Sequence, residues 1–450
     1  MEYDRNMMFS RDELIKITGA IVLKDEVSPE LTFAISTDTR TISSGDIYLP
    51  LKGASFDGEN FINKAIEAGS EAYFTTKNNI CDNSKLVLKV KNTLDAYLKL
   101  AQYYRHKLNP ITVGITGSSG KTTTKEIVYS VLKEKFNTHK TFSNHNNEIG
   151  FCQTVLSMPT NTQALIVEMG MRGLGEIELI STHLDPNYAI ITNSGTAHVG
   201  RLGSLDNIAI AKCEIAKGLE QNGTFIALEQ DIIKKHVQFN GEKIYYSLNN
   251  VKIIEKAPSY SKFEYKNEIY ELNVDGDYNI ENSLSAIELG LKLGMTPNEI
   301  RKGLASYKPI EKRWEVEDIK GLKFINDSYN ANPDSMKASV KAFLDSYKNP
   351  LVILGDMGEL GENEVQYHRE VGEYLSKLNS NVKYLTVGNL AKEIGDILTS
   401  KNFDVTSFDT NEQVACYILE NLDNRYTIFL KASRSMQFEQ ILEEIKKRDI

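Results

Sequence analysis

The chain is poor in cysteine, and this scarcity excludes the frameworks that cysteine-rich sequences build. Only four cysteines occur among 450 residues, they are far apart in the sequence, and no two of them form a CxxC pair. A zinc ribbon needs such pairs, and a disulfide-stapled secreted domain needs a denser spacing of cysteines. Isolated thiols are typical of a reducing compartment, so we expect a cytoplasmic protein.

Long apolar runs and an excess of positive charge are also missing. No stretch approaches the about 18 apolar residues of a membrane-spanning helix, and residues 1–13 lack the apolar centre of a signal peptide. The 52 lysines and arginines are outnumbered by 61 acidic residues, which gives a net charge of −9. We therefore expect no membrane insertion and no nucleic-acid partner.

The most informative segment that is present is a glycine-rich turn, GITGSSGKT, at residues 114–122. It lies between a β-branched run and a helical pattern, so its backbone N–H groups and the following helix dipole are placed to bind phosphates. Lys121 is expected to reach the β- and γ-phosphates of a nucleotide, and Thr122 to offer a hydroxyl to Mg²⁺. Ile115 stands where the usual pattern has glycine, and the alternative interpretation is an ordinary turn before a capped helix.

Three segments of the chain each have a different pattern of strands and helices, which predicts an α/β protein with three domains. Residues 1–109 mix short strands and helices and end before Pro110. Residues 110–312 alternate apolar strands with helices, as in a parallel sheet, and carry an antiparallel hairpin between Ile244 and Val274. Residues 313–450 have the pattern of a second, Rossmann-like sheet. The expected strands of the last two segments are 112–116, 165–169, 188–192, 224–228, 323–326, 351–354, 384–387 and 427–430.

Polar residues stand at positions of the middle segment where a parallel sheet places ligands. Glu168 ends a strand and suits either a Mg²⁺ ligand or a solvated carboxylate. His198 lies in a glycine-bounded loop, where a lone histidine is more often structural. Lys212, on an alanine-rich helix, has the pattern of a surface lysine. Asn282 suits a helix cap or a contact to a purine, and Arg313 suits a charge that reaches the nucleotide on domain closure, or a solvated side chain.

Taken together, several strings resemble the Mur ligases, a family of enzymes of bacterial peptidoglycan precursor synthesis. These strings fall in order over nearly the whole chain. They are STDTR at 36–40, TGSSGKTTT at 116–124, NHNNEIG at 144–150, EMG at 168–170, TN to H at 192–198, AKCEI at 211–215, DSYNANP at 327–333, GDM and ELG between 355 and 361, and KASR at 431–434. Within the family, residues 146–150 and 328–336 resemble the member that joins D-alanyl-D-alanine to UDP-N-acetylmuramoyl-tripeptide.

The resemblance implies an ATP-dependent amide ligase that gives UDP-N-acetylmuramoyl-pentapeptide, ADP and phosphate through an acyl phosphate. It implies a small α/β N-terminal domain that binds the UDP-sugar, a central P-loop ATPase domain with a parallel sheet, and a C-terminal Rossmann-like domain that binds D-alanyl-D-alanine. The implied cofactors are ATP and two Mg²⁺ ions, and we expect a monomer.

The resemblance also implies roles for individual residues, with Lys121, Lys212 and His198 as the catalytic ones. The residues implied for ATP are Gly117, Ser118, Ser119, Gly120, Lys121, Thr122, Thr123, Asn282, Arg313 and Asp327. The implied metal ligands are Thr122, Glu168, His198 and a carbamoylated Lys212. The residues implied for the two substrates are Ser36, Asp38, Arg40, Asn144, Asn147, Asn330, Asn332, Asp356 and Glu359.

Other interpretations of the same motifs stay open. A sister ligase of the family or a folylpolyglutamate synthase would use the same nucleotide chemistry on another acceptor. A non-catalytic ATP-binding scaffold would bind nucleotide and release no phosphate, although a scaffold has no need for two metal sites. A P-loop kinase or motor fits poorly, since the sequence has no second nucleotide motif and no basic track.

Overall fold

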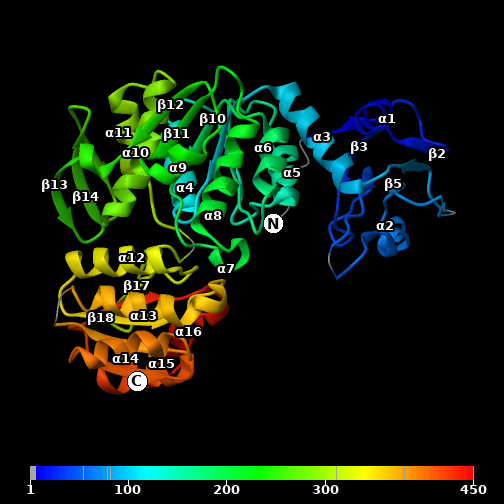
Figure 1. Ribbon diagram of the computed structural model, residues 1–450. Coiled ribbons are helices and arrows are strands. Elements are labelled where there is room, and N and C mark those ends of the chain that lie inside the picture. Colours follow the sequence, from blue (N-terminus) through cyan, green and yellow to red (C-terminus); the bar gives the residue numbers. More distant parts are fainter. Residues whose placement is uncertain are drawn as a thin grey trace.

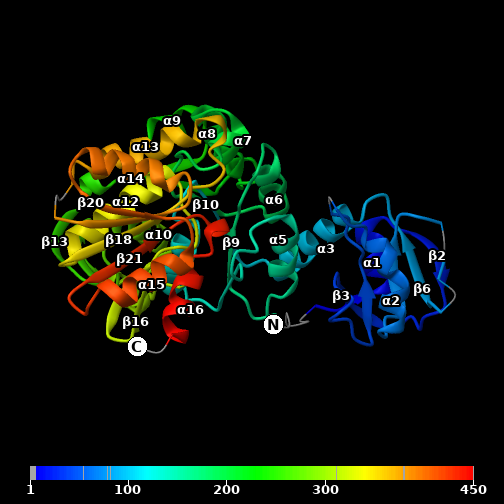
Figure 2. The same ribbon diagram turned by 90° about the horizontal axis from the view of Figure 1, so that it is seen from below.

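The computed structural model describes residues 7–448 except 54, 79, 82, 311, 379 and 380, and these described residues form three six-stranded sheets and one three-stranded sheet with helices packed on them. The predicted α/β class and the three-domain architecture are confirmed. The N-terminal domain stands apart and is joined to the middle domain by α3 (Thr93–Leu108), whereas the C-terminal domain lies against the middle one (Figure 1, Figure 2).

The N-terminal domain is a mixed sheet with the strand order β1-β3-β4-β5-β6-β2, in which β3 to β6 run parallel and the two edge strands are antiparallel. Its elements are β1 (Phe9–Ser10), α1 (Arg11–Thr18), β2 (Ile21–Asp25), β3 (Thr32–Ser36), β4 (Asp46–Tyr48), a 3₁₀ turn (Gly58–Phe61), α2 (Ile62–Glu67), β5 (Ala72–Thr75) and β6 (Leu86–Lys89). The long helix α3 ends at Asn109, which caps it in the left-handed conformation directly before Pro110.

The middle domain has a fully parallel sheet with the order β12-β11-β10-β7-β9-β8. Its four inner strands are largely apolar because helices cover both faces of the sheet, whereas the two edge strands are more polar. The elements are β7 (Ile111–Thr116), α4 (Lys121–Leu132), β8 (Thr138–Lys140), α5 (Glu148–Leu156), β9 (Ala164–Glu168), α6 (Glu176–Leu184), β10 (Tyr188–Ile191), α7 (Val199–Leu202), α8 (Leu205–Cys213), β11 (Thr224–Leu228), α9 (Asp231–His236), β12 (Glu242–Tyr246), α10 (Asp277–Lys292) and α11 (Pro297–Ser306). Helices α4, α10 and α11 pack together on one face, and α3, α5 and α6 pack on the other.

The predicted antiparallel pairing between Ile244 and Val274 is confirmed, but the start of the segment and the number of strands differ from the prediction. Ile244 belongs to β12 of the parallel sheet, and the segment that follows forms a three-stranded antiparallel sheet of β13 (Lys252–Ala257), β14 (Tyr260–Tyr265) and β15 (Glu268–Leu272). Two tight turns divide the polar alternation into three strands instead of two. In the second turn Lys266 and Asn267 both have positive φ, as a two-residue type I′ turn requires.

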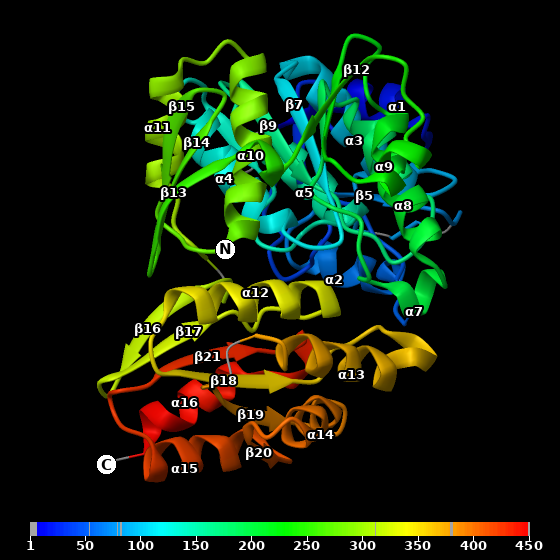
Figure 3. The same cartoon turned by 60° about the vertical axis from the view of Figure 1, so that its left-hand side comes forward.

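The C-terminal domain repeats the doubly wound plan with the order β16-β17-β21-β18-β19-β20, where only the β16–β17 pair is antiparallel. Its elements are β16 (Glu315–Ile319), β17 (Leu322–Asn326), α12 (Pro333–Ser346), β18 (Pro350–Gly355), α13 (Glu364–Leu375), β19 (Lys383–Val387), α14 (Ala391–Ser400), β20 (Asp404–Phe408), α15 (Asn411–Asn421), β21 (Thr427–Lys431) and α16 (Glu439–Lys447). Helix α12 lies on the side of this sheet that faces the middle domain (Figure 3). Among the described helices, none combines the length and the apolar character needed to cross a membrane.

Candidate active site

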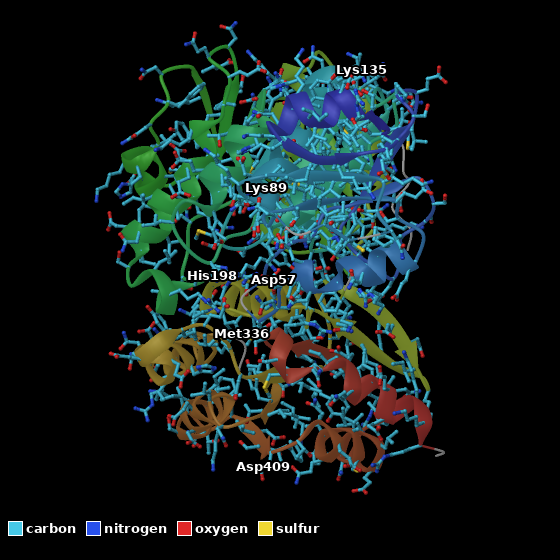
Figure 4. The ribbon with its side chains drawn as sticks, turned by 90° about the vertical axis from the view of Figure 1, so that its right-hand side faces the viewer. Asp57, Lys89, Lys135, His198, Met336 and Asp409 are labelled. Atoms are coloured by element: carbon cyan, nitrogen blue, oxygen red, sulfur yellow. The ribbon has the colours of Figure 1, made fainter. Side chains whose placement is uncertain are left out.

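A cavity of about 890 Å³ lies between the middle and the C-terminal domains. It is lined by the glycine-rich turn, by loops that follow strands of the middle sheet, and by loops of the C-terminal domain, so its walls come from the carboxyl ends of two parallel sheets. Of the residues that the sequence singled out, it is lined by Ser118, Ser119, Gly120, Lys121, Thr122, Thr123, Asn147, Glu168, His198, Asn282, Arg313, Asp327, Asn330, Asn332 and Glu359. Figure 4 shows His198 at the edge of the middle domain, near α12 and its residue Met336.

The glycine-rich turn follows β7 directly and is held by the end of the neighbouring strand β10. A Cβ at Gly117 would lie 1.8 Å from Thr192 Oγ1, and a Cβ at Gly120, whose φ is +76°, would lie 2.7 Å from Asn282 Oδ1. The side chain of Asn193 accepts a hydrogen bond from the Ser119 amide at 3.0 Å. Only glycine permits these approaches. The Ser118 and Ser119 amides donate to Asn193, so the N–H groups placed for phosphate are those of the first turn of α4, which begins at Lys121.

Lys121 is the cation of this turn. Its Nζ donates a hydrogen bond to the Gly117 carbonyl at 2.8 Å, which folds the side chain back over the turn. Burial lowers the pKa of Lys121, the carboxylate of Glu168 opposes that shift, and the positive charge of Arg313 adds to it. Lys121 and Arg313 are thus two cations close enough to influence one another, and such a pair is suited to bind a polyanion such as a triphosphate.

Glu168 ends β9 and is 2% exposed. Its Oε1 accepts a hydrogen bond from Asn146 Nδ2 at 2.9 Å, while its Oε2 is buried and has no hydrogen-bond partner in the described part of the chain. Burial alone would raise the pKa of Glu168, but the charges of Lys125, Arg313 and Lys121 hold that pKa below its usual value. A buried, ionised oxygen that accepts no hydrogen bond from the described residues is a group that a hard cation would satisfy.

His198 adopts a left-handed backbone conformation, with φ of 65°, at the start of α7. Its Nδ1 lies 2.5 Å from Glu359 Oε2 of the C-terminal domain, and Arg201 Nη2 lies 3.1 Å from the other oxygen of the same carboxylate. Burial and the charges of Lys121 and Lys212 outweigh Glu359 and lower the pKa of His198 to about 4. The imidazole is therefore neutral at pH 7, which is the state that binds metals.

Lys212 lies on α8 and is completely buried, so the sequence pattern of a surface lysine is wrong for this residue. The burial of Lys212 could not be predicted from the sequence of α8, because the small alanine residues of this helix let it pack closely on its neighbours. Its Nζ is buried without a hydrogen-bond partner among the described residues, and burial lowers the pKa of Lys212 well below its ordinary value. A buried amine in its neutral form is nucleophilic.

Contacts across the cavity join the two domains through the loop that follows β10. The amide and the hydroxyl of Thr196 both donate to Asp334 Oδ2, each at 2.8 Å. The Gly200 amide donates to the Glu359 carbonyl at 3.2 Å, and a Cβ at Gly200 would lie 2.3 Å from the Gly361 amide nitrogen. The C-terminal domain is thus seated on the middle domain beside the glycine-rich turn.

Arg313 and Asp327 reach the cavity from the junction of the two domains. The Arg313 guanidinium carbon lies 3.8 Å from the centre of the Tyr329 ring, which is a cation–π distance. Lys431 Nζ lies 2.6 Å from Asp327 Oδ2. Both side chains are therefore held in place by loops of the C-terminal domain.

Some predicted residues lie outside the lining of this cavity. Ser36, Asp38 and Arg40 belong to the N-terminal domain, where Arg40 Nη2 lies 2.5 Å from Asp38 Oδ2. Asp356 accepts hydrogen bonds from the Leu390 and Ala391 amides at the start of α14. Other predicted residues outside the lining are Gly117, Asn144 and Lys212.

Several residues that line the cavity were given no role in the sequence analysis. For Tyr278, helical spacing from Asn282 could have predicted its place at the site. Tyr278 precedes Asn282 by four residues on α10, so helical spacing places both on one face. Between them Glu281 also lines the cavity, and burial raises its pKa to about 7. The other unassigned residues with polar side chains are Asn146, Arg172, Glu176, Asn193, Ser194, Arg201, Gln230, Tyr329, Asp334, Ser335, Ser339, Lys431, Ser433, Arg434 and Ser435.

The donor set of this cavity fits magnesium in part. The Glu168 carboxylate and the Thr122 hydroxyl offer the oxygen atoms that Mg²⁺ prefers, whereas Lys212 as an amine offers none. Within the described residues, no group of three or more His, Cys, Asp and Glu side chains is placed to hold a metal ion. A complete metal site here would therefore also use substrate oxygens, as magnesium sites at phosphates usually do.

Three family models match the chain. They are the Mur ligase family, catalytic domain over residues 33–105, the Mur ligase middle domain over residues 115–290, and the Mur ligase, glutamate ligase domain over residues 312–434.

Curated and solved relatives match almost the whole chain. The UDP-N-acetylmuramoyl-tripeptide--D-alanyl-D-alanine ligase of Bacillus subtilis is 35% identical over 425 residues, which cover 91% of this chain and 92% of the relative. A crystal structure of MurF from Acinetobacter baumannii superposes with a TM-score of 0.89 at 27% identity, covering 99% of this chain and 100% of that one. The MurF ligase of Thermotoga maritima in complex with ADP gives a TM-score of 0.83 at 26% identity, with 94% and 99% coverage.

Proposed function

The chain belongs to the Mur ligase family, and from this premise we propose how its residues carry out the reaction. It is an ATP-dependent ligase of peptidoglycan precursor synthesis that joins D-alanyl-D-alanine to UDP-N-acetylmuramoyl-tripeptide. One observation supports the residue assignment. The glycine-rich turn, Glu168 and Arg313 line the same cavity as loops of the C-terminal domain.

The reaction activates a carboxylate that is by itself a poor electrophile. The carboxylate of the tripeptide attacks the γ-phosphorus of ATP, the bond to the β-phosphate oxygen breaks, and ADP leaves. The amine of the dipeptide then attacks the carbonyl carbon of the acyl phosphate, and phosphate leaves with one oxygen of the original carboxylate. Lys121 and Arg313 neutralise the charge that spreads over the transferred phosphoryl group.

ATP binds along the turn and the domain junction. The backbone N–H groups at the start of α4 and Lys121 hold the phosphates, and Asn282, which packs against Gly120, faces the nucleotide together with Asp327. The remaining residues of this assignment are Gly117, Ser118, Ser119, Gly120, Thr122, Thr123 and Arg313. Arg313 is aimed by its stacking on Tyr329.

Two Mg²⁺ ions would be held by the Thr122 hydroxyl, the Glu168 carboxylate, the neutral His198 imidazole and a carbamate on Lys212. Bound Mg²⁺ neutralises phosphate charge and orients the oxygens for in-line transfer. The buried, neutral amine of Lys212 supports the carbamate, because only the free base reacts with carbon dioxide and the product is an anionic oxygen ligand.

The two substrates are assigned mainly to different domains. Ser36, Asp38 and Arg40 of the N-terminal domain bind the UDP-sugar, and Asn144 and Asn147 face the muramoyl peptide. The dipeptide lies against the C-terminal domain, near Asn330, Asn332, Asp356 and Glu359. The side-chain oxygens of Asn147 and Asn332 cap α5 and α12, so the side-chain NH2 groups of these two residues are assigned to the ligands. These roles correspond to domains at 1–109, 110–312 and 313–450.

We further propose that the protein is a monomer and that it is located in the cytoplasm. The UDP-sugar acceptor and ATP are both metabolites of that compartment, and all the residues assigned above come from one chain. The isolated thiols support the same compartment.

The experiment that tests the function is a panel of acceptors with ATP and D-alanyl-D-alanine, with phosphate release as the rate and mass spectrometry of the products. The acceptors are UDP-muramoyl-tripeptides with lysine or diaminopimelate at the third position, UDP-muramoyl-dipeptide and a folate. We expect ligation with a tripeptide and none with the dipeptide acceptor or the folate. Turnover of the folate or of the shorter acceptor would assign a sister activity, and nucleotide binding without phosphate release would assign a scaffold.

A further inference from the structure

Lys125 is a completely buried lysine that the reaction above does not use. It follows Lys121 by four residues, so both lysines lie on the same face of α4. Its Nζ donates a hydrogen bond to the Ser143 carbonyl at 3.0 Å, and it lies 3.6 Å from Glu168 Oε2 and 3.4 Å from Glu126 Oε1. A buried cation is unfavourable without such partners, so a helix face that only needed packing would carry an apolar residue, as Ile127 and Val128 do.

The carboxylate of Glu168 is held by the same segment that Lys125 holds. Asn146 Nδ2 donates to Glu168 Oε1, and the Glu168 amide donates to Thr141 Oγ1 at 3.1 Å. The Gly170 amide, just beyond β9, donates to the Asn146 carbonyl at 2.8 Å. Residues 141–147 and the end of β9 thus form one hydrogen-bonded unit, and Lys125 joins this unit to the phosphate-binding helix.

This unit supplies two different walls of the cavity. Glu168 faces the nucleotide side, and Asn146 and Asn147 line the cavity on the segment proposed to face the muramoyl peptide. Ser143, whose carbonyl Lys125 binds, has a φ of 47°. A serine in the left-handed region is strained and needs outside contacts to stay there. The ammonium group of Lys125 supplies one such contact from beneath the loop.

We propose that Lys125 is a positioning residue, which orients the Glu168 carboxylate for magnesium nucleotide and fixes residues 141–147 for the acceptor substrate. The proposal rests on the proposed function for the identity of both ligands. Groups that hold a metal ligand from behind change metal affinity by about tenfold to a hundredfold when they are removed.

The test compares Lys125→Met, which keeps length and removes charge, with Arg105→Met as a matched control. Arg105 on α3 is also a buried cation, it hydrogen bonds to the Asp185 carbonyl and pairs with Glu220, and it lies outside the cavity lining. ATP binding is measured by calorimetry over a series of Mg²⁺ concentrations, and thermal unfolding and steady-state kinetics are measured on the same preparations.

We expect Lys125→Met to raise the Mg²⁺ concentration for half-maximal ATP binding by about tenfold or more and to raise the KM for UDP-muramoyl-tripeptide. The KM for D-alanyl-D-alanine is expected to stay unchanged, because Lys125 contacts Ser143, Glu126 and Glu168, which all belong to the middle domain. Arg105→Met lowers the unfolding temperature and moves none of these quantities. An unchanged magnesium dependence in Lys125→Met would overturn the proposal even if its rate fell.

A double-mutant cycle with Glu168→Gln separates positioning from general stability. If Lys125 acts through Glu168, the double variant binds magnesium nucleotide no more weakly than Glu168→Gln alone, and additive losses would overturn the proposal. Lys125→Gln serves as a second variant, and unfolding of both Lys125 variants beside a folded Arg105→Met would make the residue structural and also overturn it. The binding assay needs no turnover, so failure of the acceptor panel remains a separate outcome.

Discussion

Replacing Lys121 with alanine is expected to abolish ligation and leave the protein folded. The side chain ends at the glycine-rich turn, where its Nζ donates to the Gly117 carbonyl, and Lys121 is only partly buried, so its loss leaves the hydrophobic core intact. What is lost is a positive charge at the transferred phosphoryl group, and comparable charges contribute about a thousandfold or more to such reactions. Phosphate release with all substrates present is the measurement, together with the unfolding temperature.

Lys133→Ala is the control for this variant. Lys133 lies at the C-terminal end of the same helix and is exposed, so it shares the helix but not the site. Near-normal ligation by Lys121→Ala would show that the glycine-rich turn does not bind the phosphates that react. A loss of activity accompanied by unfolding would instead show that Lys121 holds the turn together.

Lys212→Ala is expected to lower the rate by about a hundredfold, in the range seen when one stabilising group of a transition state is removed, and short carboxylic acids are expected to restore part of it. Lys212 is buried, its charge acts on the pKa of His198, and its amine has no hydrogen-bond partner in the described residues. If the working form is a carbamate, its oxygens are what the reaction needs, and an acid such as acetate or propionate can place oxygens in the space left by the side chain. Rates are measured over a series of acid concentrations.

The exposed Lys217 supplies the matched control, since it belongs to the next turn of the chain and pairs with Glu178 at the surface. Lys217→Ala should keep the full rate and show no response to the acids. If Lys212→Ala is inactive and no acid restores any rate, the carbamate loses its support. Full activity of the variant would remove Lys212 from the site altogether.

The glycine-rich turn and the parallel strands could be predicted from the sequence because their signals are local. The GSSGKT turn forms a phosphate site with only the strand before it and the helix after it. All eight strands expected in the last two domains overlap observed strands. Fully buried parallel strands are apolar along their whole length, so they stand out against amphipathic helices. The strands β8, β12, β16 and β20, which lie at sheet edges, are more polar and did not stand out.

The electrostatics of the site could not be predicted, because they depend on distances between segments remote in sequence. Lys212 and Lys125 have ordinary helical neighbours, and only the packed structure shows that both are buried. The contact of His198 with Glu359 joins residues that are 161 positions apart. For Lys125 a local signal existed, since its spacing from Lys121 places both on the face of α4 that looks toward the phosphate turn.

The central claim is that ATP activates the terminal carboxylate of the tripeptide acceptor, and an oxygen label tests this most directly. UDP-N-acetylmuramoyl-tripeptide carrying oxygen-18 in that carboxylate is ligated to D-alanyl-D-alanine with unlabelled ATP in unlabelled water. Mass spectrometry of the released phosphate should then find one labelled oxygen for each amide bond formed. Pentapeptide product accompanied by phosphate without the label would contradict the acyl phosphate and the roles assigned to Lys121 and Arg313.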